Sequence, residues 1–272
     1  ALYYDMRVAE QASHADVLER LAARDPDALE GHSLGRLLRY FIQVCNAVEY
    51  AHSRGYAHRD IKPANILLGQ FGEVLLVDWG VAHKLNELPG VFGGTPGYIA
   101  PEQLDEKNPI DARSDVFALG AVLYEILCQT PALAHDSAQD LSQAAANPAV
   151  GFAVVPPRDR GGAFPIPEDM EDICLRALAV DAAARFPTAK ELGAAIEQFL
   201  EGTKEKERKH QRASELCENG DALYTSYEEL IRERPARVAE FLELRNTIPP
   251  WETEDKKQAL CDAEDGFAVM EG

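Results

Sequence analysis

The chain has 272 residues, of which 46% are hydrophobic, and its formal net charge is −19 at pH 7. The hydrophobic content suffices for a packed core and excludes wholesale disorder. The acidic balance argues against nucleic acid and anionic membrane surfaces as main partners. Five scattered cysteines without C-x-x-C spacing favour core packing in a reducing cytoplasm, and neither a signal peptide nor an apolar run of roughly 18 residues is found.

The first third of the chain predicts a strand followed by helices. Residues 1–9 have the Tyr and Val content of a strand, and residues 17–22 have one apolar helical face. The stretch 25–32 reads as a polar connection. A long amphipathic helix is expected over 34–53, with Ser33 as its N-cap.

Three polar residues then stand at loop positions beside two apolar runs. Asp60, Asn65 and Asp78 flank the runs 66–68 and 74–77, which a glycine turn joins into a predicted hairpin. Such a hairpin folds the chain back and brings Asp78 close to the other two. Two carboxylates and an amide in one cleft suit a hard, oxygen-liganded cation such as Mg²⁺.

The full stretch 58–80 resembles two loops of the eukaryotic-type Ser/Thr protein kinases. The string HRDIKPAN matches H-R-D-x-K-P-x-N, and DWG stands where the family has D-F-G. A third string, GTPGYIAPE at 94–102, is similar to G-T-x-x-Y-x-A-P-E. The resemblance implies an α+β, mostly α-helical fold: a kinase-like large lobe with short β-hairpins, followed by a helical tail.

The resemblance also implies the catalytic and metal-binding residues. Asp60 would accept or orient the proton of the substrate hydroxyl, and Lys62 would neutralise charge on the γ-phosphate. Asn65 and Asp78 would hold Mg²⁺. Thr95 would form hydrogen bonds with Asp60 and Lys62, and so join the 94–102 segment, which supports the substrate, to the catalytic loop.

Contacts to the nucleotide are implied by the same resemblance. Met6 would stand at the gatekeeper position, and the backbone from Arg7 to Ala9 would meet the adenine edge. Asp16 would reach the ribose, and Leu67 would lie beneath the adenine ring. An ordinary strand, turn and helix over 1–22 remains an equal alternative.

Two further positions of these loops are implied to be structural. His58 and Trp79 would pack together in a hydrophobic column, next to Gly80. Arg59 in this family commonly pairs with a phosphorylated residue. Residues 81–93 contain no Ser, Thr or Tyr, so we expect no phosphorylation switch there and consider Glu87 as a fixed negative charge instead.

The remainder of the lobe is predicted to be helical. An apolar helix over 114–128 should be buried on all sides, with Asp115 as a cap. The resemblance implies that Asp115 also binds the catalytic-loop backbone. Arg185 and Glu102 are implied to form a buried ion pair. Further helices are expected over 136–147, 167–178 and 188–200, with a loop over 154–167.

Composition shifts after Gly202 toward charged, sparsely apolar sequence. We therefore divide the chain into a partial protein kinase domain over 1–202 and an acidic helical extension over 203–272 that serves as an interaction or linker segment. No Gly-rich loop or V-A-I-K strand precedes the hinge-like stretch, so a small lobe is missing. A fragment that is weak or inactive alone is the expectation.

The leading hypothesis is an ATP- and Mg²⁺-dependent, cytoplasmic serine/threonine-protein kinase acting on Ser or Thr of protein substrates. The alternative is a pseudokinase-like scaffold or binding module whose helical tail docks a protein partner. A phosphotransferase for small molecules is a third possibility, which the string at 94–102 argues against.

Overall fold

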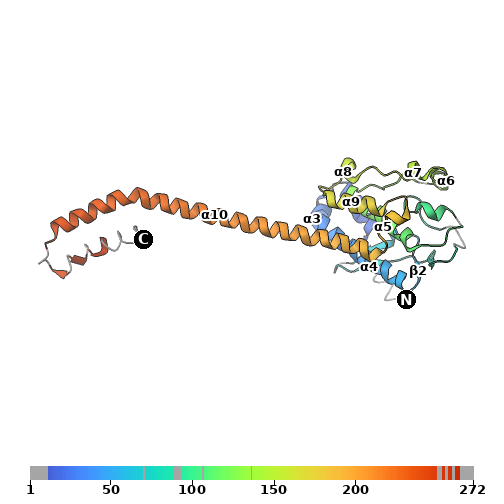
Figure 1. The fold of residues 1–272 in the computed structure, drawn as a ribbon, viewed down its shortest axis with the longest axis horizontal. Helices are drawn as coiled ribbons and strands as arrows, with labels where there is room; N and C mark the ends of the chain where they lie inside the picture. The colour runs from blue at the N-terminus through green and yellow to red at the C-terminus, as the bar shows by residue number, and fades with distance from the viewer. Residues whose placement is uncertain are drawn as a thin grey trace. The chain divides into compact units, whose positions relative to one another are not determined.

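The computed structural model describes residues 12–69, 71–88, 93–105, 107–135, 137–249, 253–254, 257–258 and 261–263. The chain divides into two compact units, Ala1–Thr203 and Lys204–Gly272. The first unit is mostly helical with a few short strands, the kinase-like large-lobe architecture that the sequence predicts (Figure 1). The strand expected over 1–9 lies outside the described residues.

A central helix organises the first unit. Helix α5 (Ala112–Cys128) is buried along its whole length from Ser114 to Cys128, as its apolar sequence predicts. It contacts both α4 (Leu34–Ser53) and α9 (Glu168–Ala177) (Figure 1). Because α5 is covered on all sides, it is a rigid support for the loops attached to its N-terminal end.

The cap of α5 differs from the prediction. Asp111 is the N-cap, and its carboxylate accepts a hydrogen bond of 2.8 Å from the Arg113 N–H. Asp115 lies one turn further on. The helix thus begins two residues earlier than expected, and the Asp115 carboxylate is free for another role.

The N-terminal helices pack beside α4. Helix α2 (His14–Ala22) buries Val17, Leu18 and Leu21, and Ser33 caps α4 as predicted. The predicted connection over 25–32 is instead a short helix, α3 (Pro26–Gly31). Proline is tolerated in a first helical turn, and the Asp25 side chain caps this turn through the Asp27 N–H at 3.0 Å.

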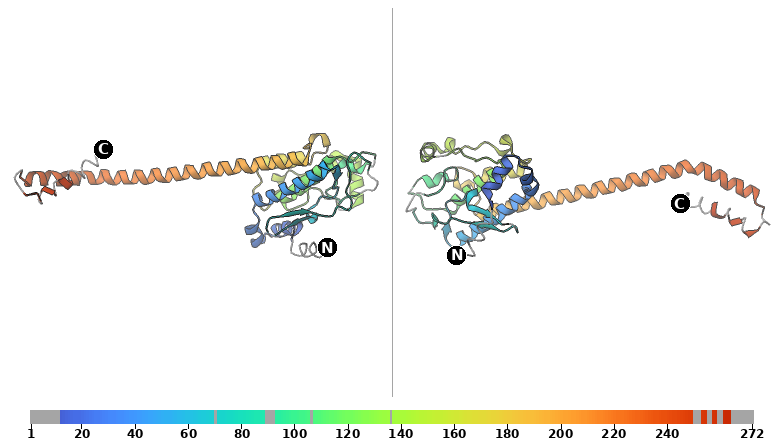
Figure 2. Two further views of the ribbon diagram at one scale, coloured as in Figure 1. Left: turned by 90° about the horizontal axis from the view of Figure 1, so that it is seen from below. Right: turned by 180° about the vertical axis from the view of Figure 1, so that it is seen from behind.

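The predicted hairpin is present. Strand β3 (Ile66–Leu68) pairs antiparallel with β4 (Val74–Leu76), with Leu67 opposite Leu75, and β1 (Ala12–Ser13) completes a sheet in the order β1-β3-β4. Strand β4 lies against α4, and Figure 2 shows these strands from two further sides. A second pairing joins β2 (Tyr56–Ala57) to β5 (His83–Lys84).

The rest of the unit consists of short elements. The predicted helix over 136–147 is α6 (Ala138–Ala146), with Ser137 as its N-cap. The predicted loop over 154–167 contains one helical turn, α8 (Pro157–Arg160). The remaining short elements are α7 (Pro148–Gly151) and the 3₁₀ turns η1 (Pro63–Asn65), η2 (Pro101–Leu104) and η3 (Ala182–Ala184).

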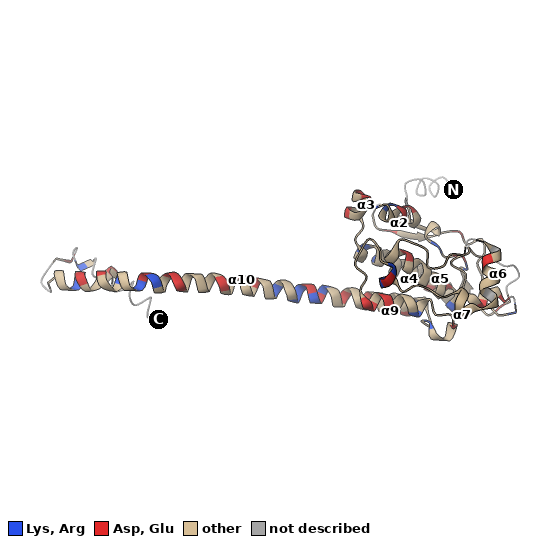
Figure 3. Ribbon diagram, turned by 90° about the horizontal axis from the view of Figure 1, so that it is seen from above, with Lys and Arg blue, Asp and Glu red and all other residues tan. Residues whose placement is uncertain are grey.

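The last long element is a single helix, α10 (Ala189–Thr247), where separate helices are predicted. Thr188 caps it through the Glu191 N–H at 3.1 Å. The helix passes through Gly202 and includes Pro235, and Lys and Arg alternate with Asp and Glu along it (Figure 3). Lys, Arg and Glu are good helix formers, which accounts for its continuity through the charged stretch.

Three cysteines are buried in the first unit, Cys45, Cys128 and Cys174, and the thiols of Cys217 and Cys261 are exposed. None of the five is paired in a disulfide. Among the described residues, no helix has the length and apolar character needed to cross a membrane.

Candidate active site

The β3–β4 hairpin brings Asn65 and Asp78 together. The Val77 N–H donates to the Asn65 carbonyl at 2.9 Å, and Asp78 is the next residue along the chain. Asp78 has φ +62°, a left-handed conformation that is uncommon for a residue other than glycine. Backbone strain of this kind persists where surrounding structure holds it in place, and it is frequent at functional sites.

The Asp60 carboxylate has three side-chain partners. Thr95 Oγ1 donates to Asp60 Oδ1 at 2.6 Å, and Lys62 Nζ lies 2.9 Å from Asp60 Oδ2. Asn65 Nδ2 donates to the same oxygen at 3.1 Å and to the Asp60 carbonyl at 2.8 Å. The structure thus brings three of the predicted residues, Lys62, Asn65 and Thr95, together around the carboxylate of a fourth, Asp60.

These donors determine the charge state of Asp60. Burial alone would raise the pKa of the carboxyl, but the hydrogen bonds from Thr95, Lys62 and Asn65 outweigh it and hold the pKa below its ordinary value. Asp60 is therefore an anion at neutral pH, able to accept a proton or to orient a hydroxyl.

The segment after Gly94 is anchored to this carboxylate. Lys62 Nζ donates to Thr95 Oγ1 at 2.6 Å, so Thr95 contacts both residues that the sequence assigns to it. Gly94 permits this approach: its φ is +130°, and a Cβ there would lie 2.9 Å from the Arg59 carbonyl oxygen. A larger residue would push Thr95 away from Asp60.

Asp115 of α5 fixes the backbone on the other side of the loop. Its Oδ2 accepts from the His58 N–H and its Oδ1 from the Arg59 N–H, both at 2.8 Å. His52 Nε2 lies 2.7 Å from Oδ2. The expected contact of Asp115 with the catalytic loop is confirmed, and it holds Arg59 in its left-handed conformation at φ +69°.

The expected ion pair between Arg185 and Glu102 is confirmed. Two guanidinium nitrogens of Arg185 lie 2.7 and 2.8 Å from the two carboxylate oxygens of Glu102, and the Arg185 side chain is fully buried. Ser114 Oγ also donates to Glu102, at 2.8 Å. The pair joins the end of the 94–102 segment to α5 and to the residues before α10.

His58 and Trp79 contact one another, with ring centroids 4.4 Å apart and planes at 60°. The predicted pairing is correct, but Trp79 is 41% exposed, so the two rings do not form a buried column. Gly80 donates through its N–H to Asp78 Oδ1 at 3.4 Å.

Arg59 donates to the Val81 carbonyl at 3.4 Å, which ties the loop after Gly80 to the catalytic loop. The carboxylate of Glu87 pairs with Lys84 at 3.7 Å. The contact between Glu87 and Lys84 is weak and exposed. The role of Glu87 as a fixed negative charge stays a prediction.

The predicted nucleotide contacts are only partly within the described residues. Met6, Arg7 and Ala9 lie outside them. Leu67 is half-buried in β3. The Asp16 carboxylate closes a capping box at the start of α2, where it accepts from the Ser13 N–H at 3.1 Å. The Asp16 side chain thus stabilises the first turn of α2.

Asn65 and Asp78 form a donor set that fits Mg²⁺. The amide nitrogen of Asn65 donates to Asp60, which leaves the amide oxygen as the atom that can bind a cation, and the side chain of Asp78 is exposed. An amide oxygen and a carboxylate, with water and phosphate oxygens as further ligands, make the kind of site that Mg²⁺ takes.

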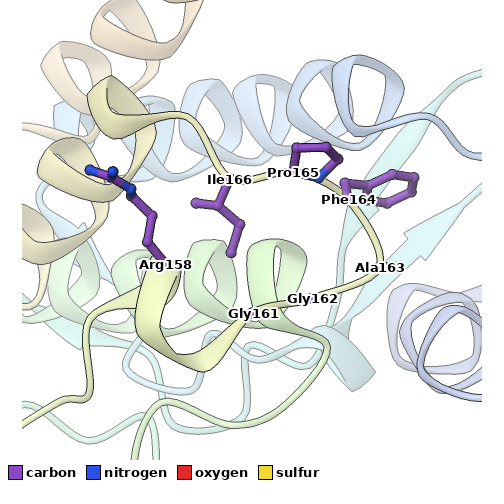
Figure 4. A pocket seen from close by; sticks show the side chains of 7 residues that line it. All are labelled: Arg158, Gly161, Gly162, Ala163, Phe164, Pro165 and Ile166. Carbon is purple, nitrogen blue, oxygen red and sulfur yellow. The ribbon is translucent and has the colours of Figure 1, made fainter.

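Two larger pockets are lined by described residues of the first unit. One, of about 540 Å³, is lined by Lys62 and Thr95 and so lies beside Asp60. The other, of about 440 Å³, runs from Arg158 to Ile166, with Arg158 and Phe164 at opposite ends in Figure 4. The second pocket contains none of the predicted site residues.

Several contributors to the site are not evident from the sequence. His52 and Ser114 support Asp115 and Glu102, and Glu125 lines the pocket beside Asp60. All three lie inside helices, where spacing alone does not show which residue faces a loop or a pocket. Their positions follow from packing between elements far apart in the chain.

The fold and the site together define a protein kinase, and comparison with known proteins agrees. The protein kinase domain family matches residues 6–196, and the chain belongs to this family. It is 33% identical over 228 residues to the serine/threonine-protein kinase PknD of Chlamydia felis, which covers 75% of this chain and 24% of that protein. The PknD proteins of Chlamydia abortus and Chlamydia trachomatis serovar D are each 32% identical, over 226 and 234 residues.

This chain thus spans about a quarter of the length of these relatives, 24%, 23% and 24% respectively. The match supports a bacterial-type kinase domain.

Proposed function

We propose that the protein transfers the γ-phosphoryl group of ATP to Ser or Thr hydroxyls of protein substrates. The observation that carries the proposal is the network in which Thr95, Lys62 and Asn65 all donate to Asp60. This network links the ionised carboxylate of Asp60, the ammonium group of Lys62 and the start of the 94–102 segment.

Each residue then has a task in phosphoryl transfer. Asp60 accepts the proton from the substrate hydroxyl or orients it, and Lys62 stabilises the negative charge of the transferring group. Asn65 and Asp78 hold Mg²⁺, which neutralises phosphate charge when bound. Leu67 lies beneath the adenine, and Asp16, Met6, Arg7 and Ala9 complete the nucleotide site.

The domain division is part of the same proposal: residues 1–202 form the catalytic part, and residues 203–272 serve as a helical interaction or linker segment. A location in the cytoplasm accords with five free cysteines. The scaffold alternative gains no support from the site, because a binding module has no physical need for a carboxylate with three aligned donors.

Incubation of the complete gene product with Mg²⁺, ATP and a mixed peptide library tests the proposal, with phosphate located by mass spectrometry. We expect phosphate on Ser and Thr of the peptides and none without Mg²⁺. Hydrolysis of ATP without phosphopeptides, or phosphate confined to small molecules, would overturn it.

A further inference from the structure

Helix α10 presents an apolar stripe that the proposed reaction does not use. Apolar side chains recur on one face at steps of three, four or seven residues, the spacing of a helix that packs against another helix. Between the charged stretch 204–212 and Pro235 the stripe consists of Leu216, Leu223, Tyr227 and Leu230, with Tyr224 and Ile231 along one edge. The exposed fraction of the four central side chains lies between 42% for Leu230 and 73% for Leu223. Adjacent, exposed side chains of this size are typical of an interaction surface.

The same stripe continues into a part of α10 that is partly covered. Val238, Phe241 and Leu244 extend it toward the end of the helix, and each is half-buried. The described residues after 252 turn back beside this end of α10 (Figures 1 and 2). This face thus packs where a second segment lies beside it, whereas within the described ranges of the chain the part from Leu216 to Ile231 is left exposed.

Gly220 lies on the same face, three residues before Leu223. Glycine weakens the interior of a helix, and a Cβ at this position would meet nothing within 4 Å in the described chain. Packing inside a single copy therefore gives no reason for a glycine here. A second helix that approaches closely gives one, because its side chains would occupy the space that a Cβ leaves free.

The charges along the stripe decide the direction of a partner helix. Residues 215–221 contain three acidic residues and no Lys or Arg, whereas residues 232–237 contain three Arg and one Glu. Arg234 stands at the centre of the stripe. A parallel second copy would place Arg234 against its own counterpart and each acidic segment against itself, which is unfavourable. An antiparallel second copy brings the acidic segment of one helix toward the basic segment of the other.

We propose that residues 212–240 of α10 form an antiparallel helix pair with a second copy of this chain. The same patch serves on both copies, as in a dimer with two-fold symmetry. In the matching register Leu223 packs against Tyr227 of the second copy, and Gly220 receives Leu230 of the second copy. The two-fold axis passes beside Tyr224. This association names the partner of the extension, and it does not depend on the proposed phosphoryl transfer.

The same register also satisfies the charges. Arg234 lies beside Leu216 of the second copy, where its methylene groups pack and its guanidinium group reaches water. Arg212 lies across from Glu240 of the second copy, and the symmetry forms this pair twice. Ion pairs at such flanking positions set the choice of partner and the orientation of paired helices.

Sedimentation of the complete gene product at several concentrations tests the association. We expect a reversible dimer, and Leu223→Glu should weaken it at least about ten-fold, because the dimer would bury this charge twice. Thr225→Glu, two residues further on and on the opposite face of α10, is the matched control and should leave the dimer unchanged. A native protein that is monomeric throughout, one that associates only with a different protein, or a dimer that Leu223→Glu leaves as tight as before overturns the proposal.

Disulfide cross-linking tests the direction of the pairing. The exposed thiols are first removed by Cys217→Ser and Cys261→Ser. In this background Tyr224→Cys places a thiol beside the two-fold axis, within disulfide reach of its own copy. Leu216→Cys faces position 234 of the second copy, 18 residues along the chain, so the two new thiols lie roughly 27 Å apart along the helix axis.

We expect a covalent dimer from Tyr224→Cys on mild oxidation, and no more than the background level from Leu216→Cys. Thr225→Cys, next to Tyr224 but on the opposite face, is the control and should also stay at background. A covalent dimer from Leu216→Cys but not from Tyr224→Cys indicates parallel helices and overturns the proposal, as does background cross-linking in both. Kinase activity enters neither measurement, so a failure of the proposed function leaves both results interpretable.

Discussion

Thr95 Oγ1 lies 2.6 Å from Asp60 Oδ1 and joins two segments that are 35 residues apart in the chain. The same oxygen accepts from Lys62 Nζ at 2.6 Å, so one hydroxyl orders the carboxylate and the cation together. Gly94, with its φ of +130°, lets the chain approach closely enough for this contact.

Removal of this hydroxyl should therefore impair the reaction. In Thr95→Ala the pKa of Asp60 rises toward its ordinary value, since one of the three side-chain donors that lower it is lost. We expect kcat to fall roughly 10- to 100-fold, less than the roughly 10²- to 10⁴-fold that a positioned proton-transfer group itself contributes, because Thr95 acts through Asp60. Thr95→Ser retains the donor and should keep most of the activity in a peptide phosphorylation assay. Equal losses in both variants would contradict the role of the hydroxyl.

Glu102→Ala should strongly destabilise the protein. It leaves the guanidinium of Arg185 buried without its carboxylate, a situation that costs about 3–5 kcal/mol. Arg237→Ala breaks an exposed pair on α10, which is worth less than about 1 kcal/mol. Urea unfolding followed by circular dichroism measures both. A midpoint for Glu102→Ala no lower than that of Arg237→Ala would contradict the prediction.

Asp115→Asn should loosen the catalytic loop. Both carboxylate oxygens of Asp115 accept backbone N–H groups, and an amide can accept with only one of its two atoms. A buried donor left without a partner costs about 1–3 kcal/mol. Faster hydrogen exchange of the His58 or Arg59 amide is the expected sign. Asp111→Asn on the same helix is the matched control, because Asn is an equally good N-cap; unchanged exchange in Asp115→Asn would count against this support.

Glu125 should make stability fall as pH rises. Burial raises the pKa of its carboxyl from 4.5 to about 6, so the folded state binds this proton more tightly than the unfolded state. The contribution is therefore fully present below pH 4.5 and is lost as pH rises through about 6. The charged groups near it are Lys62 and Glu19 of the same pocket.

In Glu125→Gln the loss of stability with rising pH should disappear. A shift of this size corresponds to about 2 kcal/mol, so the variant should gain stability over the native protein at pH 8 and little at pH 4.5. Thermal unfolding at the two pH values measures the difference, with Glu197→Gln as control. A gain that is the same at both pH values would contradict the assignment to this carboxyl.

The local strings of the sequence predict much of the site. The spacing of Asp60, Asn65 and Asp78 around a hairpin follows from turn residues and apolar runs a few residues long, whereas the contact of Thr95 with Asp60 is implied by the resemblance of the string at 94–102 to the kinase family. The burial of α5 also follows from its local sequence, because a helix that is apolar on all faces has to lie inside the lobe.

What the sequence does not predict depends on tertiary packing. Glu125 stands within an apolar helix, and no pattern shows that its side chain meets Tyr98 and a pocket. The connection over 25–32 was expected to be irregular because of its proline and glycine, yet both residues are compatible with a helical turn capped by Asp25. The continuity of α10 through Gly202 likewise reflects a cost of only about 1 kcal/mol for one glycine.

The central claim is that Asp60 accepts or orients the proton of the Ser or Thr hydroxyl during phosphoryl transfer, and one comparison of variants tests it most directly. The complete gene product and its Asp60→Asn variant are assayed with Mg²⁺, ATP and the preferred peptide, with exposed Asp172→Asn as control. We predict a fall in kcat of at least about 100-fold for Asp60→Asn and none for Asp172→Asn, with ATP binding retained. Phosphorylation at the native rate by Asp60→Asn would contradict the account.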